Sequence, residues 1–111
     1  MVPLSKVQEL IAKHSKLEKE LSSQEIDKKS FAEKSKEYSD LNDIIKEAVS
    51  YFNFQKNKDE LENLINDNDT DKDMKDLAIS ELNELVKNNE NDEKKLNYFY
   101  YLRMRQIQKM Q

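Results

Sequence analysis

The hydrophobic positions of the chain fall into three helical stretches that are separated by polar ones. In the first stretch, apolar residues recur at steps of three and four, as they do along one face of an α-helix: Leu4, Val7, Leu10, Ile11, Leu17 and Leu21. Pro3 stands where a helix start tolerates proline, and the pattern stops near Ser22 and Ser23. This stretch predicts a first helix with one buried face.

The middle stretch carries the longest apolar pattern. Asp27 is a suitable helix cap and Phe31 follows it. Five residues then alternate steps of three and four, the heptad seam of a coiled coil: Tyr38, Leu41, Ile45, Ala48 and Phe52. The stripe continues, rotated around the helix, through Tyr51, Phe54, Leu61, Leu64 and Ile65. The pattern predicts a long middle helix to about residue 66, in one piece or with a local bend.

A polar run, NDNDTDKD at 66–73, interrupts the pattern before a third stretch restarts it. The restarting residues are Met74, Leu77, Ala78, Leu82, Leu85 and Val86. Short connections favour antiparallel neighbours, and the three apolar stripes must be buried against one another. The sequence therefore predicts an all-α fold: an elongated antiparallel three-helix bundle, coiled-coil-like and dominated by a long middle helix.

The composition narrows the possible functions. Among 111 residues, 36% are hydrophobic and 38% are charged, there is no Gly or Cys, and Pro3 is the only proline. These counts exclude glycine-rich phosphate loops, disulfides, thiolate metal sites and cysteine nucleophiles. No apolar run approaches the roughly 18 residues of a membrane span, and the first residues lack a signal-peptide layout. We expect a cytoplasmic protein.

Acidic residues alternate at the start of the third stretch, like the ligands of a calcium loop. They are Asp67, Asp69, Asp71 and Asp73. Such a loop needs Gly at its sixth position and Glu at its twelfth, and counting from Asp67 those positions hold Lys72 and Ala78. The acids are expected to cap the third helix and to interact favourably with its dipole.

Other candidate chemistry is equally weak. His14 lies on the apolar face of the first helix without a recognisable partner residue, which favours a structural role. Carboxylate pairs such as Glu81 with Glu84, or Asp59 with Glu62, are expected to be solvated helix faces. We predict no catalytic, cofactor-binding or metal-binding residue, no cofactor and no enzymatic activity.

Three motifs follow one another along the chain: SFAEKSKEYSDL at 30–41, the acid- and leucine-rich run DELENLI, and DKDMKDLAISEL at 71–82. Their order from residue 35 to residue 96 resembles the first domain of bacterial class I peptide chain release factors, the type that reads UAA and UAG. PLSKVQELIAKHSKLEKELSS, near the start, resembles the family's first helix. The resemblance thus covers residues 3–96.

The resemblance implies a helical interaction domain of a translation termination factor. In that family, the glycine-glycine-glutamine loop for peptidyl-tRNA hydrolysis and the proline-anything-threonine element for stop-codon reading lie in later domains, and neither occurs here. The first domain is directed to the base of the ribosomal stalk and influences the GTPase that recycles the factor. We therefore expect a truncated release factor, with the ribosome and that GTPase as partners.

The C-terminal stretch, LNYFYYLRMRQIQKMQ at 96–111, departs from the family pattern. Back-translated with mostly A/T-rich codons and one inserted A after the fifth base, it reads LKLFLLPKDEADTKNA, a linker of the family's kind. We predict a release-factor-like domain at 1–96 and a frameshifted aromatic and basic tail at 97–111.

The tail contains no helix breaker, so it is expected to prolong the last helix. Because Asn89 and Asp92 interrupt the apolar stripe before Leu96, we expect four tail residues to be exposed: Tyr98, Tyr100, Tyr101 and Leu102. Deleting the tail should then change stability by no more than about 1 kcal/mol. An exposed apolar cluster also predicts concentration-dependent self-association.

Two other functions remain open on the sequence. The chain could be a free-standing coiled-coil adaptor or oligomerisation module. It could also bind RNA through tail residues that stack bases and contact phosphates: Tyr98, Phe99, Tyr100 and Tyr101, with Arg103, Arg105 and Lys109. Adjacent aromatics on a helix point in different directions, which disfavours RNA binding. We expect neither sequence-specific nucleic-acid binding nor a membrane partner.

Overall fold

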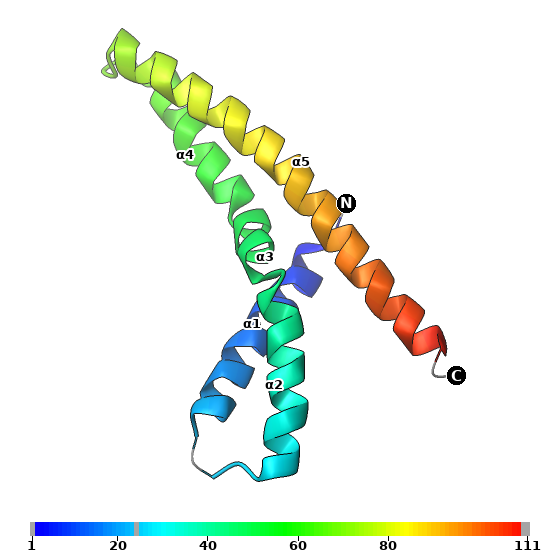
Figure 1. The fold of residues 1–111 in the computed structure, drawn as a ribbon. Helices are drawn as coiled ribbons and strands as arrows, with labels where there is room; N and C mark the ends of the chain where they lie inside the picture. The colour runs from blue at the N-terminus through cyan, green and yellow to red at the C-terminus, as the bar shows by residue number, and fades with distance from the viewer. Residues whose placement is uncertain (1, 24, 110–111) are drawn as a thin grey trace.

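The computed structural model describes the backbone of residues 2–23 and 25–109, and the side chains of these ranges as far as Arg105. This part of the chain forms five α-helices and no strand (Figure 1). They are α1 (Leu4–Ser22), α2 (Lys28–Asn42), α3 (Ile45–Phe52), α4 (Phe54–Asn66) and α5 (Lys72–Lys109). The molecule measures 59 × 34 × 18 Å. The predicted all-α class and elongated shape are confirmed.

The helices form two arms that meet at α3. One arm pairs α1 with α2, the other pairs α4 with α5, and α3 contacts both α1 and α5 (Figure 1). The predicted three-helix bundle is wrong in this respect, because the three helical regions come together only at the junction. The middle region, which comprises α2, α3 and α4, instead packs against α1 in its first part and against α5 in its last part.

The predicted middle helix ends at Asn66 as expected, but two breaks, rather than at most one bend, divide it into α2, α3 and α4. At the first break Ile44 has φ −118° and ψ −7°, and its N–H bonds to Leu41 O at 3.0 Å, three residues back. At the second break Asn53 has φ −89° and ψ 0°. Both conformations have negative φ, so these bends require no glycine. The longest helix is α5, with 38 residues.

The buried seam of the middle region differs from the predicted one at two positions. Leu41 and Ala48 are buried as predicted, but their companions are Ile44 and Tyr51. The predicted seam residues Ile45 and Phe52 are half-buried and exposed, respectively. Both sets follow steps of three and four, so the period alone could not distinguish them.

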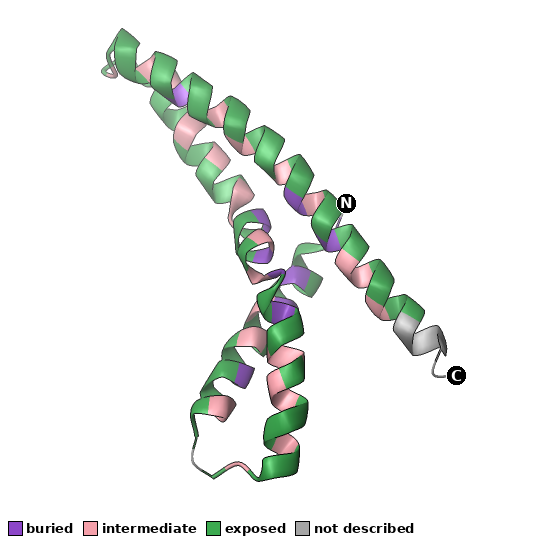
Figure 2. Cartoon of the chain, viewed as in Figure 1, coloured by how far each residue is buried: buried purple, intermediate pink, exposed green. Residues whose placement is uncertain are grey.

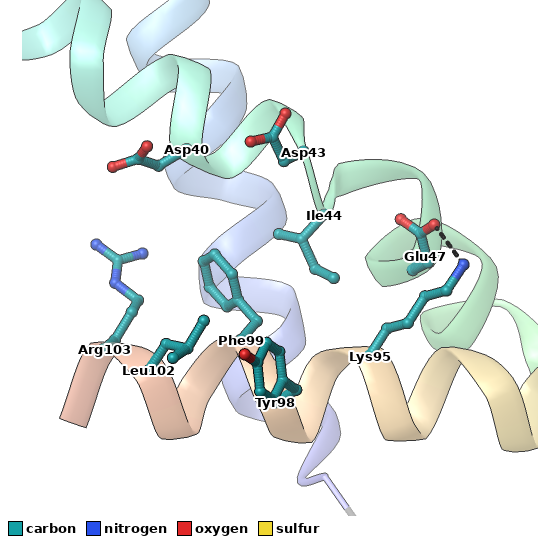
Figure 3. Close-up of a pocket in the computed structure, with 9 residues that line it drawn as sticks. All are labelled: Asp40, Asp43, Ile44, Glu47, Lys95, Tyr98, Phe99, Leu102 and Arg103. Carbon is teal, nitrogen blue, oxygen red and sulfur yellow. Dashed lines mark hydrogen bonds and ion pairs between the residues drawn. The ribbon is translucent and has the colours of Figure 1, made fainter. Parts of the chain in front are cut away.

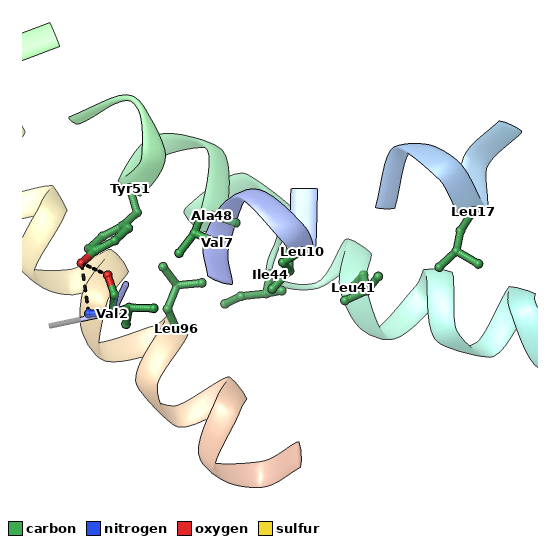
Figure 4. Close-up of a cluster of buried hydrophobic side chains, with 9 residues drawn as sticks. All are labelled: Val2, Val7, Leu10, Leu17, Leu41, Ile44, Ala48, Tyr51 and Leu96. Atoms are coloured by element: carbon green, nitrogen blue, oxygen red, sulfur yellow. Dashed lines mark hydrogen bonds between the residues drawn. The ribbon is translucent and has the colours of Figure 1, made fainter. Parts of the chain in front are cut away.

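The core lies at the junction of the two arms (Figure 4). It draws on the start of the chain, α1, the α2–α3 bend, α3 and one residue of α5. Its members are Val2, Val7, Leu10, Leu17, Leu41, Ile44, Ala48, Tyr51 and Leu96. Because each arm is only two helices thick, most apolar burial is concentrated at this junction (Figure 2).

Acidic side chains begin two of the helices, as the sequence predicts. Asp27 accepts a hydrogen bond from the backbone N–H of Ser30 at 2.7 Å. Asp71 accepts one from the N–H of Met74 at 2.8 Å at the start of α5. Each bond satisfies an N–H that has no partner within its own helix.

Tyr51 binds the first described residue of the chain. Its hydroxyl donates to Val2 O at 2.8 Å and accepts from Val2 N–H at 3.1 Å, and both residues are buried (Figure 4). Burial raises the pKa of the Tyr51 hydroxyl, which keeps it protonated and able to donate. One side chain thus satisfies two buried backbone groups.

Replacing Tyr51 by Phe is expected to lower the free energy of unfolding by about 1 to 3 kcal/mol, because two buried backbone groups lose their partner. Urea unfolding followed by circular dichroism measures this change. Tyr38→Phe is the matched control, since the Tyr38 hydroxyl makes no hydrogen bond within the described residues. Equal stability of the two variants would contradict the assigned role of Tyr51.

Candidate interaction groove at the helix junction

A groove runs between the α2–α3 bend and the C-terminal part of α5 (Figure 3). Its volume is about 520 Å³. The α2–α3 wall contributes Asp40, Asp43, Ile44 and Glu47, and the α5 wall contributes Lys95, Tyr98, Phe99, Leu102 and Arg103. The groove is therefore built from segments more than 45 residues apart in the sequence.

The apolar side of the groove is positioned by the core. Leu96 is fully buried against α3, which fixes the rotation of α5 about its axis. Phe99 follows three residues later, so it lies on nearly the same helical face and packs against the core. Ile44 is buried opposite it and Leu102 continues the apolar surface outward.

Two cations of α5 are held by residues around the groove. Lys95 pairs with Glu47 at 3.3 Å (Figure 3). The Arg103 guanidinium lies 5.3 Å from the centre of the Phe99 ring and 3.8 Å from a Glu37 oxygen. These contacts join α5 to α2 and α3, although exposed ion pairs contribute at most about 1 kcal/mol each.

Two acids on the α2–α3 wall are left uncompensated. Asp40 and Asp43 are exposed, and their carboxylates make no ion pair or hydrogen bond within the described residues. In Figure 3 Asp40 and Asp43 stand along the wall across from Arg103 and Phe99. The groove thus combines an apolar floor with two uncompensated acids on its α2–α3 wall.

Comparison with known proteins identifies the type of domain. Residues 10–103 match the PCRF domain family. The chain belongs to this family. The match contains all nine groove residues and ends at Arg103, so it also includes the first part of the tail.

A curated relative of this PCRF domain is "Peptide chain release factor 1" of Pelagibacter ubique (strain HTCC1062). It is 52% identical over 99 residues, which are 89% of this chain. The same residues are 28% of the relative, so the PCRF domain described here spans little more than a quarter of that protein's length. No solved structure matches the chain.

The tail of this PCRF domain prolongs α5 as predicted, and its four aromatics divide into two pairs. Tyr98 and Tyr101 are 63% and 57% exposed, and Leu102 is also exposed, as expected. Tyr100 contradicts the prediction, because it packs against the core and donates a hydrogen bond to Lys6 O at 3.1 Å. Burial raises the pKa of this hydroxyl.

The seam of α5 contains the polar residues Asn89 and Asp92 as predicted, but they do not end the packing as expected. Each has a buried side-chain oxygen without a hydrogen-bond partner within the described residues, and Leu96 beyond them belongs to the core. Burial of a carboxylate was not expected from the pattern, because charged residues are almost never fully buried without a partner. The frameshift assignment of residues 97–111 stays a prediction, which the nucleotide sequence of this region tests.

Sequence reasoning missed the groove and the docking of Phe99 and Tyr100. A signal was present, since these residues lie three and four positions after Leu96 and therefore share its face of α5. The RNA-binding alternative is not favoured by this arrangement: Phe99 and Tyr100 meet edge to face, at 77°, and both pack inward. The Lys109 side chain lies outside the described residues.

His14 joins the two helices of the first arm. Its Nε2 lies 3.1 Å from Asn42 Oδ1, and its ring stacks on Tyr38 with the ring centres 4.7 Å apart. These contacts agree with the structural role that the sequence favours.

The acidic residues of the α4–α5 turn serve the backbone. Asp67 accepts from the N–H of Asp69 at 2.9 Å, and Asp71 caps α5. Within the described residues, no group of three or more His, Asp or Glu side chains is arranged to hold a metal ion. Of the predicted carboxylate pairs, Glu81 and Glu84 border a shallow depression between α4 and α5, and Asp59 accepts a hydrogen bond from Gln55.

None of the helices in the described part of the chain is long and apolar enough to cross a membrane.

Proposed function

We propose that this PCRF domain acts in translation termination, as the helical interaction domain of a peptide chain release factor. The observation that carries the proposal is the 52% identity over 99 residues to a relative named as such a factor. Identity of this extent reaches well beyond the similarity that a shared heptad pattern produces. It therefore disfavours the alternative of a free-standing coiled-coil adaptor or oligomerisation module.

The chemistry of these 111 residues supports a binding role rather than a catalytic one. They contain no glycine, so they cannot form a glycine-glycine-glutamine loop. Their only proline is Pro3, which is followed by Leu4 and Ser5 rather than by a proline-anything-threonine element. We therefore propose that the chain by itself neither reads stop codons nor hydrolyses peptidyl-tRNA.

The proposed partners follow from the family. The ribosome is the main partner, with the base of its stalk as the proposed contact, and the recycling GTPase is the second. With these partners, we propose a cytoplasmic location for the protein. The uncompensated acids of the groove and the exposed sides of both arms are surfaces available for such contacts.

We expect the purified chain to release no peptide from ribosomal termination complexes at UAA, UAG or UGA. The physical reason is that the chain contains no glycine and therefore lacks the glycine-glycine-glutamine loop that promotes hydrolysis of the ester bond in the family. Release of labelled peptide from immobilised complexes measures this, with an intact release factor as the positive control. Release above the buffer control would overturn the assignment.

Binding is tested separately by competition. A large excess of the chain is expected to slow release by an intact factor, and only at high concentration, because the contribution of the other domains to affinity is missing. An unrelated acidic helical protein of similar size serves as the control. Equal effects of the two proteins would argue against the ribosome as a partner.

A further inference from the structure

The outer side of α5 near its C-terminal end carries an apolar surface that nothing in the described chain covers. Tyr98, Tyr101 and Met104 are each more than half exposed, and Leu102 is 38% exposed. Their spacing places them on adjoining positions around the helix. We call these four residues the outer arc of α5; it begins at the groove, because Tyr98 and Leu102 also line that groove (Figure 3).

A cation lies within the outer arc. Arg105 follows Tyr98 by seven residues and Leu102 by three, so it occupies the same side of α5. It is exposed and makes no ion pair within the described residues. Arg103, two positions earlier, is instead held by Phe99 and Glu37. Arg105 is therefore available to an external anion.

The same molecule presents the complementary half of this surface. Asp40 and Asp43 are uncompensated on the opposite wall of the groove, directly beside the apolar floor. One chain therefore has two adjoining apolar surfaces, one with an unpaired cation and the other with unpaired anions. Tyr98 and Leu102 belong to both surfaces. A self-complementary patch of this kind is what a two-fold interface between identical subunits requires.

We propose that two copies of this chain pair through the outer arc of α5, with Arg105 of each copy meeting the Asp40 and Asp43 wall of the other. The register follows from the helix. In an antiparallel pairing centred between Tyr101 and Leu102, Arg105 of one copy lies opposite Tyr98 of the other, at the edge of the groove. A parallel pairing would instead bring the two Arg105 side chains together.

The pairing is weak because the surface is small. Four apolar side chains and two pairs of exposed charges fall short of the interface of about 1,200 to 2,000 Å² that stable complexes bury. We expect a monomer–dimer equilibrium that shifts with concentration in the micromolar to millimolar range. Raising the salt concentration weakens it, since exposed charges are screened.

The charges allow a decisive test by sedimentation velocity across a concentration series. The double variant Asp40→Lys with Asp43→Lys, and separately the single variant Arg105→Glu, are each expected to weaken self-association about tenfold, because like charges then face each other. An equimolar mixture of the two variants restores association to within about threefold of the parent. In the mixed pair both contacts again join opposite charges.

The matched control reverses two exposed acids of α4, Asp59→Lys with Glu60→Lys, and makes the same change in net charge away from the groove. It is expected to leave self-association unchanged, apart from a small general effect of net charge. Circular dichroism of every variant confirms that the helices are retained.

Three results would overturn the proposal. If the parent chain stays monomeric at about 1 mM, the proposed dimer does not form in the concentration range expected for an interface of this size. Reversal variants that associate like the parent would show an apolar contact without the charge pairing. A mixture no better than its separate components would exclude the two-fold arrangement.

Discussion

Truncating Leu41 to alanine is expected to lower the free energy of unfolding by about 2 to 5 kcal/mol, the range for a large-to-small change in a packed core. Leu41 is 1% exposed and lies where α1 meets the α2–α3 bend. With a core concentrated at one junction, few other side chains can move to fill the space. Urea unfolding, followed by circular dichroism at a dilute and fixed protein concentration, measures the change.

Ile45→Ala provides the internal comparison for Leu41→Ala. Ile45 is half-buried at the edge of the same core, so its truncation should cost clearly less, below about 2 kcal/mol. The heptad pattern alone treats Leu41 and Ile45 as equivalent seam residues. Equal losses would favour that pattern over the broken helix described here, and a negligible loss for Leu41→Ala would show that the junction is not the core.

Deleting residues 97–111 is expected to lower the free energy of unfolding by about 2 to 4 kcal/mol, because Phe99 and Tyr100, which are partly buried against the core, lose this burial. This revises the limit of about 1 kcal/mol that the sequence suggests. The deletion should also abolish self-association. Melting curves in dilute solution, together with sedimentation, measure the two effects on the same proteins.

Two matched double variants separate these effects of the tail. Phe99→Ala with Tyr100→Ala removes the inward pair, and is expected to reproduce most of the stability loss. Tyr98→Ala with Tyr101→Ala removes the outward pair, and should change stability by no more than about 0.5 kcal/mol while weakening self-association. If both variants were equally stable, the tail would not be packed against the core as described.

The packing of the tail is compatible with the predicted frameshift. Any helix that continues from Leu96 presents positions 99 and 100 to the first arm, and in this chain those positions hold large aromatic residues. A frameshift therefore does not require an exposed tail, since out-of-frame codons for large side chains can still fill such positions. Reading the DNA in the alternative frame tests the frameshift independently of stability.

The sequence predicts the two helical walls of the candidate groove but not their proximity. Each of its walls was recognisable as helix, and the charges of Asp40, Asp43 and Arg103 were evident from the sequence. Their proximity was not, because it depends on the break at Ile44 and on the rotation of α5 that Leu96 fixes. Neither feature has a local sequence signature in a chain without glycine.

The sequence by itself determined that this protein is helical, where its first helix ends, and which acids cap its helices, because periodicity and capping act within a few residues. It also carried the family resemblance, which the comparison over residues 10–103 confirms. Only the tertiary structure decided that Ile44 and Tyr51 rather than Ile45 and Phe52 are buried, that α5 is the longest helix, and that Phe99 and Tyr100 pack inward. The physical reason is that alternative stripes with the same spacing have nearly equal local energies, so contacts between distant segments select among them.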